Sequence, residues 1–427
     1  MDQTVSRAER LHGSVSLPAD KSIGHRTALL SALADGPSRI ENYPSSADPQ
    51  STLDCLHQLG VASEHEGSTV HIEGHGLEGL SAPDAPLDCG NSGTTMRLLS
   101  GILAGQPFDS VLTGDASLRS RPMARIADPL REMGAEVALT DGHAPIRIGG
   151  GSALHGMTYR LPIASAQVKS CVLLAGLFAE GPTTVVEPTP SRDHTERMLG
   201  LDVETVDGVR HLTVEPGHRV PARTWHVPGD FSAAAFFLVA ASIVPGSEVR
   251  LDGVGMNPSR NALLDVLRTM GADIAVANER MKGGEPIADV TVRGTDLHAT
   301  RVDGAQIPNL IDEIPVLAVA AACATGRTEI RDAAELRVKE TDRLDAMAQN
   351  LQALGAAVDE FDDGLAIEGP AALHGTTVSS FDDHRIAMAM GVAGLVADGA
   401  TTITDADCAR VSFPNFWDEL HAVTEPA

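Results

Sequence analysis

The segment Asp20–Gly36, with the sequence DKSIGHRTALLSALADG, decides the fold because its pattern returns five times along the chain. It begins with polar residues that favour a helix N-terminus, continues with an apolar stretch one helix long and ends at a glycine. Because these stretches are apolar on nearly every face, we predict buried helices. The other copies occupy Gly90–Gly105, Ser165–Gly181, Gly229–Gly246, Asp312–Gly326 and Asp382–Gly399.

A second feature recurs between these helices, the end of another helix that runs into a strand. It reads LHQLG in its first copy, and a sixth copy after FWDELHAV meets the C-terminus. We therefore predict an α/β (α+β) fold of six repeats, each with two helices and several short strands, with three repeats in each of two domains. The five complete copies end at Gly60, Gly134, Gly200, Gly271 and Gly355.

The domain boundary is best placed at Val227–Asp230, where a Pro-Gly pair precedes a repeat. The N-terminal stretch that ends at SVSLPAD has no helical unit of its own, so we expect it to pair with the shortened sixth repeat. One domain would then consist of residues 1–19 plus 229–427, and residues 20–228 would form an inserted central domain. A length of 427 residues fits this division, because a single core stops growing at roughly 250–300 residues.

Composition excludes several classes of partner. A formal charge of −26 argues against nucleic acid and anionic membranes, which require a basic face. The five cysteines are odd in number and form no CxxC pair, which indicates a reduced, cytoplasmic chain without a zinc cluster. The sequence has no apolar leader and no run of 18 apolar residues, so we expect neither secretion nor a membrane span.

Polar residues gather at the start of the apolar helices. A helix N-terminus offers unpaired N–H groups and a partial positive charge, so several ends that converge on an interdomain cleft would bind a polyanion. For any one helix, ordinary capping with solvated charges explains the same residues. Lys339 and Arg343, spaced i, i+4, are expected on one helical face with Glu340 beside them, where a surface ion-pair network is the alternative. No metal-ligand spacing or dinucleotide fingerprint occurs, so we expect no metal and no cofactor.

The motifs, taken together, resemble the 5-enolpyruvylshikimate-3-phosphate synthase family. They follow that family's order over nearly the whole chain and are closest to its second, mostly bacterial class. The resemblance implies two domains of three βαβαββ units each, with the active site in the cleft between them. The motifs are DKSIGHR, GNSGTTMR, SLRSRPM, SAQVKS, PSRDHTE, PGDFSAAAFFL, LRVKETDRL and DDHRIAM.

The family's activity is the transfer of the enolpyruvyl (1-carboxyvinyl) group of phosphoenolpyruvate to the 5-hydroxyl of shikimate 3-phosphate, with release of phosphate. The resemblance implies Asp312, Glu340 and Lys21 as catalytic residues. It assigns shikimate 3-phosphate to Lys21, Ser22, Arg26, Ser165, Ala166 (through its backbone), Gln167, Arg192, Asp312 and Lys339. It assigns phosphoenolpyruvate to Lys21, Gly93, Arg121, Gln167, Arg343 and Arg385. The expected protein is a cytoplasmic monomer of chorismate and aromatic amino-acid biosynthesis whose partners are these two substrates.

The chain departs from the family's usual pattern at several positions. Ala19 stands where glycine is usual, Gly24 where serine is usual, and Val411 where some members carry lysine. Two alternatives stay open. The first is a sister transferase that acts on UDP-N-acetylglucosamine, which typically has a reactive cysteine in the loop that here reads DASLRSRPM. The second is a non-catalytic protein that binds phosphorylated metabolites.

Overall fold

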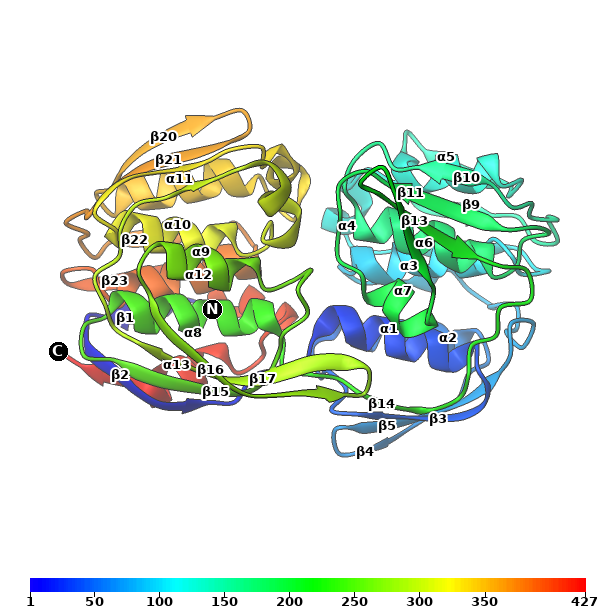
Figure 1. The fold of residues 1–427 in the computed structure, drawn as a ribbon, viewed down its shortest axis with the longest axis horizontal. Coiled ribbons are helices and arrows are strands. Elements are labelled where there is room, and N and C mark those ends of the chain that lie inside the picture. Colours follow the sequence, from blue (N-terminus) through cyan, green and yellow to red (C-terminus); the bar gives the residue numbers. More distant parts are fainter. The chain divides into compact units, whose positions relative to one another are not determined.

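The computed structural model describes residues 1–427, which fold into two compact units (Figure 1). The first unit combines Met1–Pro18 with Pro228–Ala427, and the second is Ala19–Val227. Each of the two boundaries between the units lies one residue before the position expected from the sequence. No helix in the chain combines the length and the apolar character that are needed to cross a membrane.

The second unit contains three four-stranded sheets and seven helices. Its helices are α1 (Lys21–Ala32), α2 (Ala47–Gln58), α3 (Gly93–Leu103), α4 (Ala116–Ser120), α5 (Ala124–Glu132), α6 (Ala166–Gly176) and α7 (His194–Leu199). Its strands are β3 (Asp35–Glu41), β4 (Ser63–Glu66), β5 (Thr69–His75), β6 (Leu87–Asp88), β7 (Ser110–Thr113), β8 (Val137–Thr140), β9 (His143–Ile148), β10 (Thr158–Arg160), β11 (Thr183–Glu187), β12 (Val203–Val206), β13 (Val209–Val214) and β14 (Thr224–His226).

The first unit contains sheets of three, four and five strands. Its helices are α8 (Phe231–Ile243), α9 (Ala262–Thr269), α10 (Ile314–Cys323), α11 (Arg343–Ala353), α12 (His384–Gly394) and α13 (Phe416–Val423), with the 3-10 helices η1 (Gly304–Asn309), η2 (Ala334–Val338) and η3 (Ala406–Val411). Its strands are β1 (Gln3–Ser6), β2 (Ala8–Val15), β15 (Glu248–Gly255), β16 (Asp273–Lys282), β17 (Glu285–Arg293), β18 (Arg301–Val302), β19 (Gly326–Ile330), β20 (Ala357–Phe361), β21 (Gly364–Gly369), β22 (Thr377–Ser379), β23 (Ala400–Thr404) and β24 (Thr424–Pro426).

The predicted repeat is present in the sheet topology. Sheets β6-β7-β9-β8, β10-β11-β13-β12 and β18-β19-β21-β20 share one order, in which the first two strands are parallel and the others antiparallel. A buried helix connects the parallel pair, as α3 connects β6 and β7. This is a βαβαββ unit, because the parallel pair needs a crossover whereas the antiparallel strands need only a turn.

Strands that lie far apart in sequence complete the repeats at the chain crossings. In the second unit, β14 pairs in parallel with β3 and supplies the first strand of the repeat that contains α1. In the first unit, β1 pairs with β23, and β2 pairs with both β15 and β24. The N-terminal stretch therefore joins the shortened sixth repeat, and each unit is closed by its own two ends.

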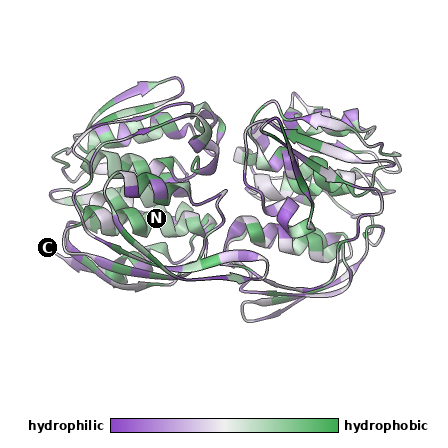
Figure 2. Ribbon diagram, viewed as in Figure 1, coloured by the Kyte–Doolittle hydropathy of each residue, from purple (hydrophilic) through white to green (hydrophobic).

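The six apolar helices form the interior of the units, and Figure 2 shows α8 largely in the hydrophobic colours. Every residue of α8 is buried, and α8, α10 and α12 pack against one another. In the second unit, α3 packs against both α1 and α6. The crossing of α3 and α6 depends on Gly101, because a Cβ atom there would lie 2.3 Å from the carbonyl oxygen of Cys171.

Two of the glycines that were expected to end the apolar helices lie in strands instead. The helix α1 ends at Ala32, but Gly36 lies inside β3 with a φ of +117°. Likewise, Gly326 is the first residue of β19, three positions beyond the end of α10. For these two helices the expectation of a glycine stop was wrong, because both glycines belong to the next strand and lie beyond the point where the helix has ended.

Aromatic residues are few, yet they concentrate at one place in the first unit. Phe416 is fully buried and its ring contacts those of Phe236, Phe237, Phe413 and Trp417 at centroid distances of 4.9–5.7 Å. The cluster joins α13, a helix of the sixth repeat, to α8 of the fourth. It therefore fastens the C-terminal helix to the core of the unit.

We expect Phe416→Ala to destabilise the first unit by about 3–5 kcal/mol, because truncation of a buried phenylalanine removes its packing and leaves a cavity. Urea unfolding followed by tryptophan fluorescence measures this in a Trp225→Phe background, where Trp417 is the one remaining tryptophan. Met281→Ala is the control, because this side chain is 65% exposed and its truncation should change stability by less than about 0.5 kcal/mol. A loss below about 1 kcal/mol in Phe416→Ala would contradict the assigned role.

Candidate functional site

The N-terminus of α1 presents the first predicted group of cations in the second unit. Asp20 caps the helix by accepting a hydrogen bond from the Ile23 amide at 2.9 Å. Lys21 follows in the first turn, and its Nζ atom lies 2.9 Å from Oδ2 of Asp48. Asp48, in the first turn of α2, did not enter the predicted site. Its side chain holds the lysine, and both groups keep a small exposed fraction of 16% and 11%.

Arg26 lies one turn further along α1 and is almost wholly buried. Its Nη1 atom donates to the Ser22 carbonyl at 2.8 Å, so the two predicted residues are in direct contact. Its Nε atom donates to Oγ1 of Thr195 at 2.7 Å, and its Nη2 atom donates to Oγ of Ser170 at 2.9 Å. The guanidinium is therefore fixed by three elements, α1, α6 and α7.

The start of α3 positions Gly93 and Arg121. Asn91 accepts from Nη2 of Arg121 at 2.7 Å through its side chain and from Nη1 at 3.3 Å through its carbonyl. The Asn91 amide in turn donates to Asp115, which caps α4. A Cβ atom on Gly93 would approach Nη1 of Arg97 to 2.8 Å and Nη1 of Arg121 to 3.5 Å. The absence of a side chain at Gly93 thus leaves room between two guanidinium groups.

Gln167 is linked to α3 through two hydrogen bonds. Its Oε1 atom accepts from Nη1 of Arg97 at 2.6 Å, and its Nε2 atom donates to Oγ1 of Thr94 at 3.0 Å. Ser165, the residue before α6, caps that helix. Arg97, the last residue of the GNSGTTMR motif, is not among the predicted site residues, although its position four residues after Gly93 places it over the same turn.

Arg192 occupies the loop that precedes α7 and is half-buried. Next to it, Ser191 is held by the side chain of Glu187, which accepts from the Ser191 amide at 3.0 Å. The predicted residues of the second unit therefore lie at the N-termini of α1, α3 and α6 and in the loops before α5 and α7.

Asp312 is the centre of the predicted group in the first unit. Nη1 of Arg343 lies 3.4 Å and Nζ of Lys339 lies 3.6 Å from Oδ1 of Asp312. On the other oxygen, Nη2 of Arg385 is 3.8 Å away, while Nη1 of Arg385 donates to the Asp312 carbonyl at 2.9 Å. Three predicted cations thus surround one predicted carboxylate, and Glu340 joins them through Arg343 at 2.6 Å.

Arg343 is anchored by a carboxylate that the predicted site did not include. Asp383 accepts from Nε of Arg343 at 2.7 Å and from Nη2 at 3.3 Å, and both side chains are buried. Burial acts to lower the pKa of Arg343, but the carboxylates of Asp383, Glu340 and Asp312 outweigh it and raise the pKa. The guanidinium therefore stays charged. Asp383 also caps α12, where its Oδ1 atom accepts from the Arg385 amide at 2.8 Å.

The expected helical face of Lys339 and Arg343 is wrong. The helix α11 begins at Arg343, and Lys339 follows the short helix η2. Asp342 lies between them as the N-cap of α11 and accepts a hydrogen bond from the Asp345 amide at 3.1 Å. The cap begins a new helix there, and the two cations meet on Asp312 through the path of the loop rather than through helical spacing.

The presence of glycine at position 24, where serine is usual, has a steric explanation. A Cβ atom there would lie 2.5 Å from Cγ and 2.7 Å from Cδ of Pro44. Because such contacts do not occur in folded proteins, Pro44 requires glycine at this position of α1. The departure removes no charged group from α1.

His25 lies beneath the α1 cations and is wholly buried. Its Nδ1 atom is 2.7 Å from Oγ1 of Thr52. Burial lowers the pKa of His25 well below its ordinary value, and the charges of Lys21 and Arg26 act in the same direction. The imidazole is therefore neutral, which avoids adding a third positive charge under the helix N-terminus.

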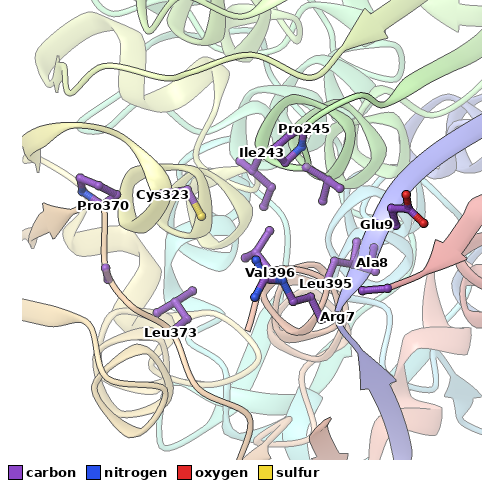
Figure 3. Close-up of a pocket in the computed structure, with 13 residues that line it drawn as sticks. Arg7, Ala8, Glu9, Ile243, Pro245, Cys323, Pro370, Leu373, Leu395 and Val396 are labelled. Carbon is purple, nitrogen blue, oxygen red and sulfur yellow. The ribbon is translucent and has the colours of Figure 1, made fainter. Parts of the chain in front are cut away.

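A cavity of about 540 Å³ lies elsewhere in the first unit (Figure 3). Its lining includes Ile243, Cys323 and Leu395, where α8, α10 and α12 end. None of the predicted site residues lines it. Because helix C-termini carry a partial negative charge, this cavity is unsuited to the anions that the N-terminal cations would bind.

The repeated fold, with cations and carboxylates at the ends of buried helices, is that of an enolpyruvyl transferase. The solved structure of the enolpyruvyl transferase NikO from Streptomyces tendae covers 98% of this chain with a TM-score of 0.80 and 21% identity, a likeness of fold. An EPSP synthase from Acinetobacter baumannii covers 100% of this chain and 98% of its own, with a TM-score of 0.88 and 44% identity.

Sequence comparisons narrow the class further. A family model for EPSP synthase (3-phosphoshikimate 1-carboxyvinyltransferase) matches residues 5–420. The protein of that name from Salinibacter ruber is 67% identical over 99% of this chain and 100% of its own length. The one from Herpetosiphon aurantiacus is 53% identical over the full length of both chains. The chain belongs to the EPSP synthase family, which confirms the resemblance seen in its motifs.

We expect His25→Asn to flatten the dependence of stability on pH. As the pH falls below about 6.5, His25 takes up a proton in the unfolded chain but stays neutral in the folded chain. The free energy of unfolding therefore decreases with falling pH until the lower pKa of the folded chain is reached. The variant should lose up to about 1.4 kcal/mol less per pH unit than the parent in this range. Urea unfolding between about pH 7.5 and 5.5 measures the slope.

The matched control for this pH series is His421→Asn, a substitution on the exposed side of α13. It should leave the slope as it is in the parent. Equal slopes in His25→Asn and the parent would mean that His25 is protonated in the folded chain as readily as in the unfolded one, contrary to the buried, neutral ring described above.

Proposed function

We propose that the cation groups of both units serve one reaction, the transfer of the enolpyruvyl group of phosphoenolpyruvate to the 5-hydroxyl of shikimate 3-phosphate. The chain is a 3-phosphoshikimate 1-carboxyvinyltransferase of the shikimate pathway, which supplies chorismate for aromatic amino-acid biosynthesis. The observation that carries the residue assignments is the gathering of Lys339, Arg343 and Arg385 around Asp312.

The charges of the two substrates explain why so many cations are needed. Each substrate carries a phosphate and a carboxylate, and two unit charges about 4 Å apart repel by roughly 4 kcal/mol at an effective dielectric constant of 20. Helix N-termini and guanidinium groups offset this repulsion. For shikimate 3-phosphate we propose Lys21, Ser22, Arg26, Ser165, the Ala166 backbone, Gln167, Arg192, Asp312 and Lys339.

Phosphoenolpyruvate is smaller and needs cations close to both of its ends. We propose that Arg121 and Gly93 meet it in the second unit, where the missing side chain of Gly93 leaves space beside two guanidinium groups. Lys21 and Gln167 belong to both substrate groups in this proposal. Arg343 and Arg385 supply positive charge from the first unit, and Arg343 is fixed for this by Asp383.

The chemistry then follows as addition and elimination. The 5-hydroxyl attacks the enol carbon of phosphoenolpyruvate while Asp312 accepts the hydroxyl proton, and the methylene carbon gains a proton to become a methyl group. Loss of a methyl proton and of phosphate from this tetrahedral intermediate gives the enolpyruvyl ether. We assign the proton transfers at the methylene carbon to Glu340 and Lys21, which act as general acid and base.

The alternative acceptor, UDP-N-acetylglucosamine, is not favoured. The loop from Asp115 to Met123 contains no cysteine, and Cys89 is fully buried. A hydrogen bond with Cys55, together with burial, raises the pKa of Cys89, so this thiol is not activated. The carboxylates Asp312 and Glu340 beside the cations also disfavour a protein that only binds anionic metabolites, because recognition of an anion requires cations whereas proton transfer requires groups such as these.

We also propose that the enzyme acts in the cytoplasm as a monomer. All five cysteines are free, which suits a reducing compartment. Size-exclusion chromatography with light scattering tests the oligomeric state directly.

We expect Asp312→Asn to lower kcat for phosphate release by about 10²–10⁴-fold, because the amide cannot accept the hydroxyl proton. The assay uses shikimate 3-phosphate with phosphoenolpyruvate, and UDP-N-acetylglucosamine as the competing acceptor. Asp265→Asn is the control, a change at an 80% exposed carboxylate on α9 that should leave kcat unaltered. A kcat within about threefold of the parent in Asp312→Asn would refute the assignment as base, and release of phosphate with only the other acceptor would refute the reaction.

A further inference from the structure

Lys169 belongs to a buried ionic cluster that the proposed reaction does not use. This residue of α6 has no exposed surface, and its Nζ atom lies 2.8 Å from Oε1 of Glu187 and 2.8 Å from Oε1 of Glu196. Arg210, on β13, lies 2.8 Å from Glu187 and 3.4 Å from Glu196. Two positive and two negative side chains therefore balance one another inside the second unit.

Stability alone does not account for such a cluster. Removal of charged groups from water costs several kcal/mol per ion, so a buried ion pair is often no more stabilising than apolar residues of the same size. The cluster is better explained by the groups that its side chains hold in place. Its four side chains come from α6, β11, α7 and β13, and they join these elements at one point.

The first group that the cluster holds is Ser191. Oε1 of Glu187 accepts hydrogen bonds from the Ser191 amide at 3.0 Å and from its hydroxyl at 2.5 Å. Nζ of Lys169 donates to the Ser191 carbonyl at 3.4 Å. The main chain immediately before Arg192 is thus fixed on both its amide and its carbonyl side.

The second group is Arg26. Two of its side-chain partners, Ser170 and Thr195, directly follow Lys169 and directly precede Glu196 in the sequence. Their hydroxyl oxygens lie 2.6 Å apart. The ion pair of Lys169 and Glu196 therefore holds α6 and α7 at the separation that lets both hydroxyls meet one guanidinium.

We propose that Lys169 is a positioning residue that orients Arg192 and Arg26 toward shikimate 3-phosphate. The proposal rests on the substrate assignment above. Lys169 itself does not touch the substrate. Loss of its charge would release the Ser191 main chain and loosen the contact of α6 with α7. Phosphoenolpyruvate would be affected much less, because its residues are held from outside the cluster. Arg121 is held by Asn91 and Ser117. Gln167 is held by Arg97 and Thr94 of α3.

The test compares Lys169→Met with Lys282→Met, a matched control at an exposed position of β16. We expect Lys169→Met to raise KM for shikimate 3-phosphate by at least about tenfold and KM for phosphoenolpyruvate by less than about threefold. The control should change neither constant. A purely structural role would lower the amount of active enzyme and leave both KM values unchanged, and that result would overturn the proposal.

Two further variants keep the test decisive if Lys169→Met fails to fold. Lys169→Met combined with Glu196→Gln keeps the cluster electrically balanced, and Ser191→Ala removes only one hydroxyl contact. Each should raise KM for shikimate 3-phosphate selectively, by about threefold or more in Ser191→Ala. If KM for shikimate 3-phosphate does not rise relative to KM for phosphoenolpyruvate in the folded variants, the positioning role is overturned. Calorimetric binding of shikimate 3-phosphate to the parent enzyme separates this outcome from failure of the substrate assignment, since the parent would then not bind it.

Discussion

The structure depends on holding many positive charges close together before any substrate arrives. Two cations about 4 Å apart repel as strongly as two anions do, by roughly 4 kcal/mol at an effective dielectric constant of 20. Each unit solves this with carboxylates that lie against the cations. Asp48 pairs with Lys21, and Asp383 pairs with Arg343. These pairs offset the repulsion between cations, so a chain with a net charge of −26 can carry clustered positive side chains at its helix ends.

This constraint also explains why the helices are so apolar. A helix such as α8 or α10 is buried on all faces, so a charged side chain along its length would be removed from water without compensation. The first turn is the place where polar groups meet unpaired N–H groups and remain partly accessible. Repetition of one βαβαββ unit multiplies such ends, and close approach of the helices at Gly101 keeps neighbouring ends near one another.

Features of the fold that depend on local sequence patterns could be predicted from the sequence. Apolar stretches of helical length and the order of the motifs predicted the six repeats, and the strand β1 joins the sixth repeat as its missing helical unit suggested. The path from Lys339 to Arg343 was not predictable from spacing, because the cap formed by Asp342 competes with a continuous helix and only the structure decides between them.

Partners that come from distant segments were also beyond the sequence. Asp48 and Arg97 each have an ordinary local role as helix residues, and nothing nearby in the sequence marks them as companions of Lys21 and Gln167. The same holds for Gly24, because the ring of Pro44, twenty positions away in the sequence, leaves no space for a side chain there. Tertiary contact decides these positions, whereas local propensity decides the helices that carry them.

The two aspartates around Arg343 differ in how firmly the protein engages them. Asp383 is wholly buried, contacts Arg343 at 2.7 Å and caps α12, so both of its oxygens are engaged within the protein. Asp312 keeps 13% of its side chain exposed, and its cations stand off at 3.4–3.8 Å. A carboxylate whose cations stand off keeps lone pairs for a substrate hydroxyl, whereas the lone pairs of one that is engaged in short hydrogen bonds are already used. The geometry thus separates the residue that fixes the cations from the residue that we propose as acceptor of the hydroxyl proton.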